Sequence, residues 1–181
     1  MIARNSVGTS LESDKTHVPV LILVAQISAQ PLAPTTTRDF NKIVITWQEP
    51  VNFGSTPITS YTIEIRLGDE SGFSQTSECN GALAAIRDAR SCSVLISTLV
   101  SPPFSLAWGQ SVFARVSATN IKGTSPFSVA GNGDLVAINP DKPTNLANVP
   151  SITTASQIGL SWLEGTTFYG LPVLDYTLSY D

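Results

Sequence analysis

Apolar and polar residues alternate along several short stretches of this chain, which is the pattern of a β-strand with one buried face. Glycine, proline, asparagine and serine separate these stretches, as in the turn-rich run over residues 49–57. No stretch of the sequence repeats its apolar residues as clearly at helical spacing. The alternating apolar positions are Ile43, Ile45, Trp47, Tyr61, Ile63, Ile65, Val94, Ile96, Val112, Ala114, Val116 and Ala118. The pattern predicts short antiparallel strands in two facing sheets, a β-sandwich that buries both alternating faces.

One eight-residue pattern, A-x-N-x-x-G-T-S, occurs at residues 3–10 and again at residues 118–125. The two copies lie 115 positions apart (118 minus 3). The same offset relates further landmarks, namely Trp47 to Trp162, Pro57 to Pro172 and Tyr61 to Tyr176. Solenoid repeats are roughly 20–50 residues long, so this longer period fits a whole domain used in tandem.

The repeat divides the chain into one complete module, expected over residues 31–139, and two partial ones. Residues 1–28 hold the end of a preceding module, from the end of its strand F through strand G. Residues 142–181 hold the first three strands of a following module. Proline-containing connectors at residues 29–31 and 139–143 join the modules and limit bending between neighbours. On this division the chain is a segment of a longer tandem array.

Three stretches of the middle copy resemble strands of a fibronectin type III domain. They read ITWQEP at residues 45–50, PITSYTIEIR at residues 57–66 and VSATNIKGTSPFS at residues 116–128. In combination they look like strands B, C and F of that family, and the chain resembles the modules of large multi-repeat surface or secreted proteins. The resemblance implies an all-β fold, an immunoglobulin-like antiparallel β-sandwich.

The same resemblance implies roles for individual residues. In the family, the B-strand tryptophan packs in the core, the C-strand tyrosine lies against the opposing sheet, and the A-x-N-x-x-G segment turns from strand F toward strand G. The implied core residues are Trp47, Tyr61, Trp162 and Tyr176, and the implied turn residues are Asn120, Gly123, Asn5 and Gly8. The family's tyrosine corner falls on Trp108, so its hydroxyl anchor is missing.

Cys79 and Cys92 enclose twelve residues, a loop short enough for a disulfide to staple the region between the third and fourth strands. On the chain-entropy estimate such a disulfide adds about 3 kcal/mol of stability. Two unpaired thiols in a cytosolic chain are the alternative, because cysteine spacing alone does not determine redox state. With His17 as the only histidine, the chain does not favour a four-ligand zinc site. We expect no metal site and no cofactor.

Residues 17–27 read HVPVLILVAQI, a run that is apolar on both faces. An edge strand of a sandwich buries one face and presents the other to water, so a two-sided apolar strand predicts a second partner. Packing on the adjoining module is one explanation, and lateral contact between chains, as in a fibre, is the other. This candidate interaction strand comprises Val18, Val20, Leu21, Ile22, Leu23 and Val24.

Charge and hydropathy argue against several classes of partner. The chain has 181 residues and a net charge of −4, and its basic residues do not cluster, which argues against nucleic acid. The longest apolar run, residues 18–25, is shorter than the about 20 residues of a membrane-spanning helix. His17 lies at the edge of an apolar strand, and the carboxylates of Asp69, Glu70 and Asp88 fall in predicted turns without calcium-loop spacing. We therefore expect no membrane insertion and no catalytic site.

These features predict a non-enzymatic structural or adhesive protein, extracellular or on the cell surface, whose modules contact their neighbours and self-associate into a fibre. The alternatives are a protein- or carbohydrate-binding accessory module of a secreted enzyme, and a receptor ectodomain. The fold alone does not choose among them, because this sandwich hosts many functions.

Overall fold

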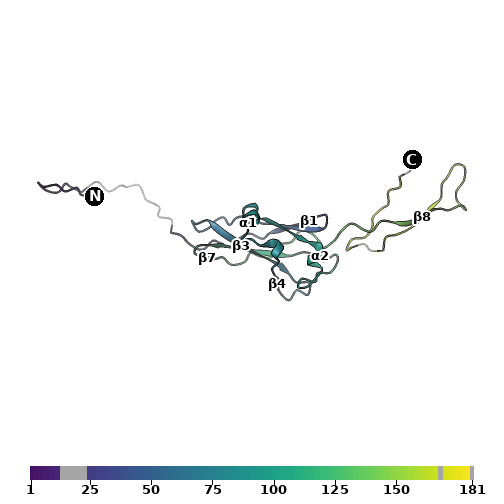
Figure 1. The fold of residues 1–181 in the computed structure, drawn as a ribbon, viewed down its shortest axis with the longest axis horizontal. Helices are drawn as coiled ribbons and strands as arrows, with labels where there is room; N and C mark the ends of the chain where they lie inside the picture. Colours follow the sequence, from purple (N-terminus) through teal and green to yellow (C-terminus); the bar gives the residue numbers. More distant parts are fainter. Residues whose placement is uncertain (13–23, 167–168, 180–181) are drawn as a thin grey trace.

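The computed structural model describes residues 1–12, 24–166 and 169–179 (Figure 1). The strands are β1 (Thr35–Asp39), β2 (Lys42–Thr46), β3 (Ile58–Arg66), β4 (Phe73–Ser74), β5 (Ser91–Leu95), β6 (Ala114–Asn120), β7 (Gly123–Thr124), β8 (Thr144–Asn148) and β9 (Leu160–Leu163). Between them lie the 3-10 helix η1 (Ser77–Cys79) and the α-helices α1 (Ala84–Ala89) and α2 (Ile96–Leu99). None of the helices in these ranges has the length and apolar content needed to span a membrane.

Two antiparallel sheets face each other in the middle of the chain. One has the strand order β1-β2-β5 and the other has the order β4-β3-β6-β7 (Figure 1). The pairs β2–β5 and β3–β6 lie in different sheets, as strands B–E and C–F do in immunoglobulin-like folds. The predicted fold class, an all-β immunoglobulin-like antiparallel β-sandwich, is confirmed.

The core lies between the two sheets, at the positions predicted from the alternation. From β2, Ile43 and Ile45 have no exposed surface, and from β3, Ile63 and Ile65 are only 2% and 1% exposed. The same cluster includes Val94, Ile96, Leu99, Phe104, Leu106, Val112, Ala114, Val116, Ala118 and Val136. Full burial of one large aliphatic or aromatic side chain contributes about 1.5–3 kcal/mol, so these facing stripes are the main source of stability.

Short helices occur between β4 and β6, where the sequence pattern predicted only strands. The six residues of α1 contain neither glycine nor proline, and the helix ends at Arg90, whose φ of 51° is left-handed. The four residues of α2 begin at Ile96, which the alternation had assigned to a strand. Helices this short make little more than one turn, so their apolar spacing leaves no recognisable period in the sequence.

Residues 134–139, which align with the last strand of the family fold, form no strand in the structure. Val136 is buried, but the pairing of this segment with the sheet is an isolated bridge between Ser111 and Leu135. On the edge of the sheet away from β3, β6 pairs with β7, which spans only two residues. The N–H groups of Ala118 and Val116 in β6 donate at 3.0 Å to the hydroxyls of Ser125 and Ser128 and not to backbone carbonyls, so the regular ladder stops after β7. The chain then rejoins the sheet edge only at isolated points.

The segments on either side of the sandwich have little regular structure. β8 and β9 pair as an antiparallel hairpin beyond the end of the sandwich that carries α2 (Figure 1). Residues 1–12 contain one isolated antiparallel bridge, between Arg4 and Thr9. The module boundaries inferred from the repeat stay a prediction.

The candidate interaction strand falls mostly on positions that the structure does not describe. Val18, Val20, Leu21, Ile22 and Leu23 lie outside the described residues, as does His17. Val24 lies within them, is 67% exposed and belongs to no strand. Contact of this segment with a partner stays a prediction.

Candidate functional site at the module joints

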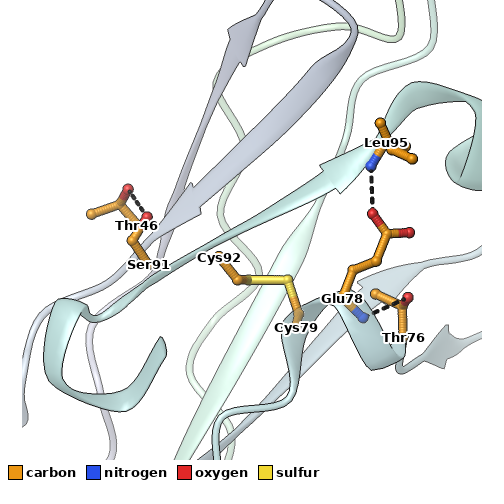
Figure 2. The surroundings of a disulfide bond; sticks show 7 residues. All are labelled: Thr46, Thr76, Glu78, Cys79, Ser91, Cys92 and Leu95. Carbon is orange, nitrogen blue, oxygen red and sulfur yellow. Dashed lines mark hydrogen bonds between the residues drawn. A yellow bond between two sulfur atoms is a disulfide. The ribbon is translucent and has the colours of Figure 1, made fainter. Parts of the chain in front are cut away.

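Cys79 and Cys92 form a disulfide with their Cα atoms 5.2 Å apart, and both residues are buried (Figure 2). The bond links η1 to β5 and so ties the segment that leaves one sheet to a strand of the other. The alternative of two unpaired thiols does not hold in this structure. The disulfide closes a short loop beside the core, where it restricts the unfolded chain and adds stability.

Glu78, next to the disulfide, was not recognised from the sequence. Its carboxylate accepts the N–H of Leu95 at 2.9 Å (Figure 2) and the hydroxyl of Thr98 at 2.6 Å. Both donors lie where β5 passes into α2, so the carboxylate binds this junction to η1. A single glutamate in a turn-rich stretch gives no signal in the sequence, because its partners lie 17 and 20 residues away.

Trp47 and Tyr61 lie in the core between the two sheets. Their rings meet edge to face with centroids 5.4 Å apart, and only 3% and 4% of the two residues are exposed. Such ring pairs add about 0.5–1.5 kcal/mol beyond their burial. Burial raises the pKa of the Tyr61 phenol, the charge of Glu49 raises it further, and Arg90 opposes this shift.

The corresponding pair in the last copy, Trp162 and Tyr176, is not a core pair in the structure. The two rings keep the same edge-to-face contact, with centroids 5.3 Å apart, but the residues are 40% and 38% exposed. The two residues are therefore not enclosed in the described chain, and the expectation that they are core residues of their module stays a prediction. The physical reason is that β8 and β9 make a single hairpin, whereas two facing sheets enclose Trp47 and Tyr61.

The repeated A-x-N-x-x-G-T-S pattern is a hairpin closed by its own serine. In the second copy, Ser125 donates its N–H to the carbonyl of Ala118 at 2.8 Å, and its hydroxyl accepts the Ala118 N–H at 3.0 Å. In the first copy, Ser10 and Ala3 make the same two bonds at 2.8 Å and 2.9 Å. The two copies therefore share a local hydrogen-bonded structure as well as a sequence.

The asparagine of the pattern begins the turn of this hairpin. The side-chain oxygen of Asn120 accepts the N–H of Lys122 at 2.8 Å, and that of Asn5 accepts the N–H of Val7 at 2.9 Å. Asparagine favours such turns because its side chain bonds to the backbone two residues on. Gly123 has a φ of 141°, which other residues rarely adopt. The asparagine and the serine of the pattern thus have the same local reason to recur in both copies.

Asn120 has a second contact, with residues 26–30, the segment that leads into the sandwich and that we call the connector. Its amide nitrogen donates to the carbonyls of Gln26 at 2.7 Å and Phe53 at 3.0 Å, and 3% of the residue is exposed. The N–H of Gln26 donates in turn to the carbonyl of Gly54 at 2.9 Å. Both backbone polar groups of Gln26 are therefore bonded to the module. We call this arrangement of Gln26, Gly54 and Asn120 the connector clamp.

Further hydrogen bonds hold residues 26–30 against the same end of the sandwich. The N–H of Ala29 donates to the carbonyl of Asn52 at 2.8 Å, and the side-chain amide of Gln30 donates to the carbonyl of Phe127 at 2.6 Å. The connector consequently lies between the turn after β2 and the segment after β7. It is attached along its length and not only at one residue.

A different contact joins the other end of the sandwich to the segment after β9. Trp108, in the turn before β6, meets the ring of Tyr169 edge to face with centroids 5.0 Å apart. Beside the rings, a Cβ on Gly170 would lie 2.5 Å from the backbone nitrogen of Gly109, so these two backbones are in close contact. A pocket of about 290 Å³ adjoins the two rings, and its apolar lining includes Ile96, Val100 and Ile138. We call this contact the ring joint.

The carboxylates singled out in the sequence lie in surface turns. The Asp69 carboxylate accepts the N–H and the hydroxyl of Ser71 at 3.0 Å and 2.7 Å, and these bonds lower the pKa of its carboxyl group. Asp88 pairs with its neighbour Arg87 at 2.9 Å. Within the described ranges, no group of three or more histidine, cysteine or acidic side chains is arranged to hold a metal ion.

No protein-family model matches the sequence, and no curated protein is similar to it. Solved structures do match. A crystal structure of consecutive titin domains is 19% identical over 62% of this chain and 33% of that chain, with a TM-score of 0.46. A titin module from human cardiac muscle is 21% identical over 60% of this chain and 90% of that chain, with a TM-score of 0.43.

A third similar structure is the sixth fibronectin type III domain of human fibronectin type III domain containing protein 3. It is 20% identical over 64% of this chain and 91% of that chain, with a TM-score of 0.43. The chain spans only a part of the longer matched structures, 33% of the consecutive titin domains and 17% of titin kinase with its flanking domains. Each of these is a similarity of fold.

Proposed function

We propose that this chain is a segment of a non-enzymatic structural array, a string of fibronectin type III-like modules held in fixed orientation. The observation that supports this most directly is the connector clamp, because a flexible tether needs no bonds to its domain. The bonded backbone of Gln26 makes the connector part of the module surface. Tension along the chain then passes through the folded sandwich.

We also propose that the array lies outside the cell, on the surface or secreted, as in the large multi-repeat proteins that the chain resembles. The buried disulfide between Cys79 and Cys92 supports this, since structural disulfides persist in oxidising compartments and are rare in the cytosol. The partners of the array are its own neighbouring modules and other copies of the array. Lateral contact through residues 18–24 is the route to a fibre.

The outer face of the sheet β4-β3-β6-β7 also favours a structural role. The guanidinium of Arg115 lies between the rings of Phe73 and Phe127, 4.0 Å and 4.4 Å from their centroids. Two of its nitrogens bond to the carboxylate of Glu64 at 2.9 Å and 2.7 Å. Cation–π contacts at such sites contribute about 0.5–1 kcal/mol each. Arg115 therefore stabilises this face of the sheet through its contacts with neighbouring side chains.

The native polypeptide, isolated with an antibody against residues 31–139, provides the test. We expect a mass several times that of the 181-residue chain and elongated particles whose axial repeat is one module. Deletion of residues 18–24 should abolish lateral assembly and leave the particles elongated. A native polypeptide without further modules would refute the array. An attached catalytic domain would favour the accessory-module alternative, and a membrane-spanning helix would favour the receptor ectodomain.

A further inference from the structure

The turn that follows the second strand of a module has two successive residues with positive φ angles in both copies. Gly54 and Ser55 have φ angles of 77° and 57°, and Tyr169 and Gly170, which lie 115 positions later (169 minus 54), have φ angles of 43° and 94°. All four angles fall in the left-handed region that most side chains avoid. The two turns share this pair of positive φ angles and differ in their side chains. Glycine comes first in one copy and second in the other.

In the first joint, the missing side chain of Gly54 makes room for the connector. A Cβ at this position would lie 2.0 Å from the carbonyl oxygen of Gln26 and 2.9 Å from the amide nitrogen of Asn120. Carbon atoms do not approach other atoms this closely, so any side chain at position 54 displaces the Gln26 backbone. The connector clamp therefore depends on glycine at this position of the turn.

In the second joint, Tyr169 has a ring where Gly54 has only hydrogen. The ring extends to Trp108 of the preceding module, and the neighbouring Gly170 allows the turn to approach the backbone of that module. Ile138 aligns with Gln26 at an offset of 112 (138 minus 26), the offset that also relates the connector prolines. Among the described residues, Ile138 makes no backbone hydrogen bond to Tyr169. The ring joint thus uses side chains where the connector clamp uses backbone.

From these two joints we infer that the turn position occupied by Gly54 and Tyr169 decides how neighbouring modules are held together. Glycine lets the connector bond to the turn, and an aromatic residue docks the turn on the preceding module. The inference rests on the proposed function, since it treats both segments as joints of one array. At the first joint the connector is bonded to the turn through the backbone of Gln26. At the second joint the connector at residues 139–143 is bonded through side chains, since Thr166 donates its hydroxyl to the carboxylate of Asp141 at 2.9 Å. Successive joints therefore differ in the groups that hold them.

The first joint is tested by amide hydrogen exchange of the whole chain, followed by NMR at Gln26. We expect Gly54→Ala to accelerate this exchange at least about tenfold, because the new Cβ displaces the connector and opens the bond locally. Gly72→Ala is the matched control, since a Cβ there meets nothing within 4 Å and should leave Gln26 exchange unchanged. Gly54→Tyr, which copies the residue of the second joint, should have at least as large an effect.

The second joint is tested by residual dipolar couplings of the amides in β8 and β9, compared with those of the sandwich. Tyr169→Gly removes the ring that meets Trp108. We expect the couplings of the hairpin to fall at least about twofold relative to the sandwich, because its orientation is then averaged by motion. Tyr169→Phe keeps the ring and should keep the couplings of the wild-type chain.

Unchanged exchange at Gln26 in Gly54→Ala would overturn the inference for the first joint, and unchanged hairpin couplings in Tyr169→Gly would overturn it for the second. Fast amide exchange at Val94 in the core would show that Gly54→Tyr does not fold. In that case the result for Gly54→Ala alone decides the inference for the first joint. These measurements use a single purified chain. Intact joint behaviour together with a native polypeptide that lacks further modules would refute the proposed function and not the chemistry of the joints.

Discussion

Replacing Asn120 with aspartate separates the two contacts of this side chain. The carboxylate keeps the acceptor that binds the N–H of Lys122, but it loses the amide nitrogen that donates to the carbonyls of Gln26 and Phe53. At neutral pH a negative charge then faces two carbonyl oxygens that were 2.7 Å and 3.0 Å from the amide nitrogen. We expect this variant to be destabilised, and more strongly as pH rises.

The expected loss follows from the bonds and the burial. Each donated hydrogen bond contributes a net of about 1 kcal/mol, and a carboxylate at this buried position facing two carbonyls costs a further 1–3 kcal/mol or so, giving about 3–5 kcal/mol at pH 7. The carbonyls raise the pKa of the new carboxyl above its unfolded value of about 3.9. At a pH below this unfolded value the carboxyl is protonated and can donate to one of the two carbonyls. The loss in the free energy of unfolding therefore falls to about 1 kcal/mol near pH 3.

Urea unfolding of the variant and the wild-type chain, followed by circular dichroism from pH 3 to pH 8, measures this difference. Asn5→Asp is the matched control, because Asn5 is exposed and its oxygen accepts the N–H groups of Val7 and Gly8, which an aspartate also does. That control should change stability by less than about 0.5 kcal/mol. An Asn120→Asp loss that is small at pH 7, or equal at pH 3 and pH 7, would refute the assignment of the two donated bonds.

Three further predictions concern the core and the disulfide. Replacing both Cys79 and Cys92 with alanine should lower the free energy of unfolding by about 3 kcal/mol in urea denaturation, and a loss below about 1 kcal/mol would contradict the staple. Glu78→Gln removes a charged acceptor from two hydrogen bonds and should cost about 1–3 kcal/mol in the same assay, whereas the exposed control Asp88→Asn should cost less than about 0.5 kcal/mol. Because burial holds the pKa of the Tyr61 phenol above its ordinary 10.0, the associated stability is complete below pH 10 and is lost as pH rises through the folded pKa. The alkaline unfolding curve of Tyr61→Phe should therefore be shallower than that of the wild-type chain, and identical curves would exclude Tyr61 as the titrating group.

The sandwich core could be predicted from the sequence because burial of one strand face imposes a period of two. Ile43 and Ile45 show that period, and both are fully buried in the structure. The same rule failed at Ile96, which is buried as predicted but begins a helix. Burial is a property of the side chain, whereas the backbone here is bonded to residues far along the chain. The N–H of Ile96 donates to the carbonyl of Asn41 at 2.8 Å, and Glu78 binds the β5–α2 junction on either side of it.

The joints could be predicted only in part. The sequence marks Asn120 as a turn residue, but the carbonyls that its amide binds are 94 and 67 residues away. A backbone carbonyl has no sequence signature, since every residue has one. Tyr169 likewise carries no pattern that indicates its contact with Trp108, because that contact depends on how two segments meet in space.

The sequence by itself determined the alternation of the strands and the 115-residue repeat, and its repeated pattern marks a turn in both copies. The alternation and the turn depend on residues that are close together along the chain, so the sequence is enough to predict them. Only the tertiary structure decided that Asn120 holds a connector and that Trp108 meets a ring of the next segment. It also decided that two facing sheets enclose Trp47, since burial depends on which surfaces a second sheet covers.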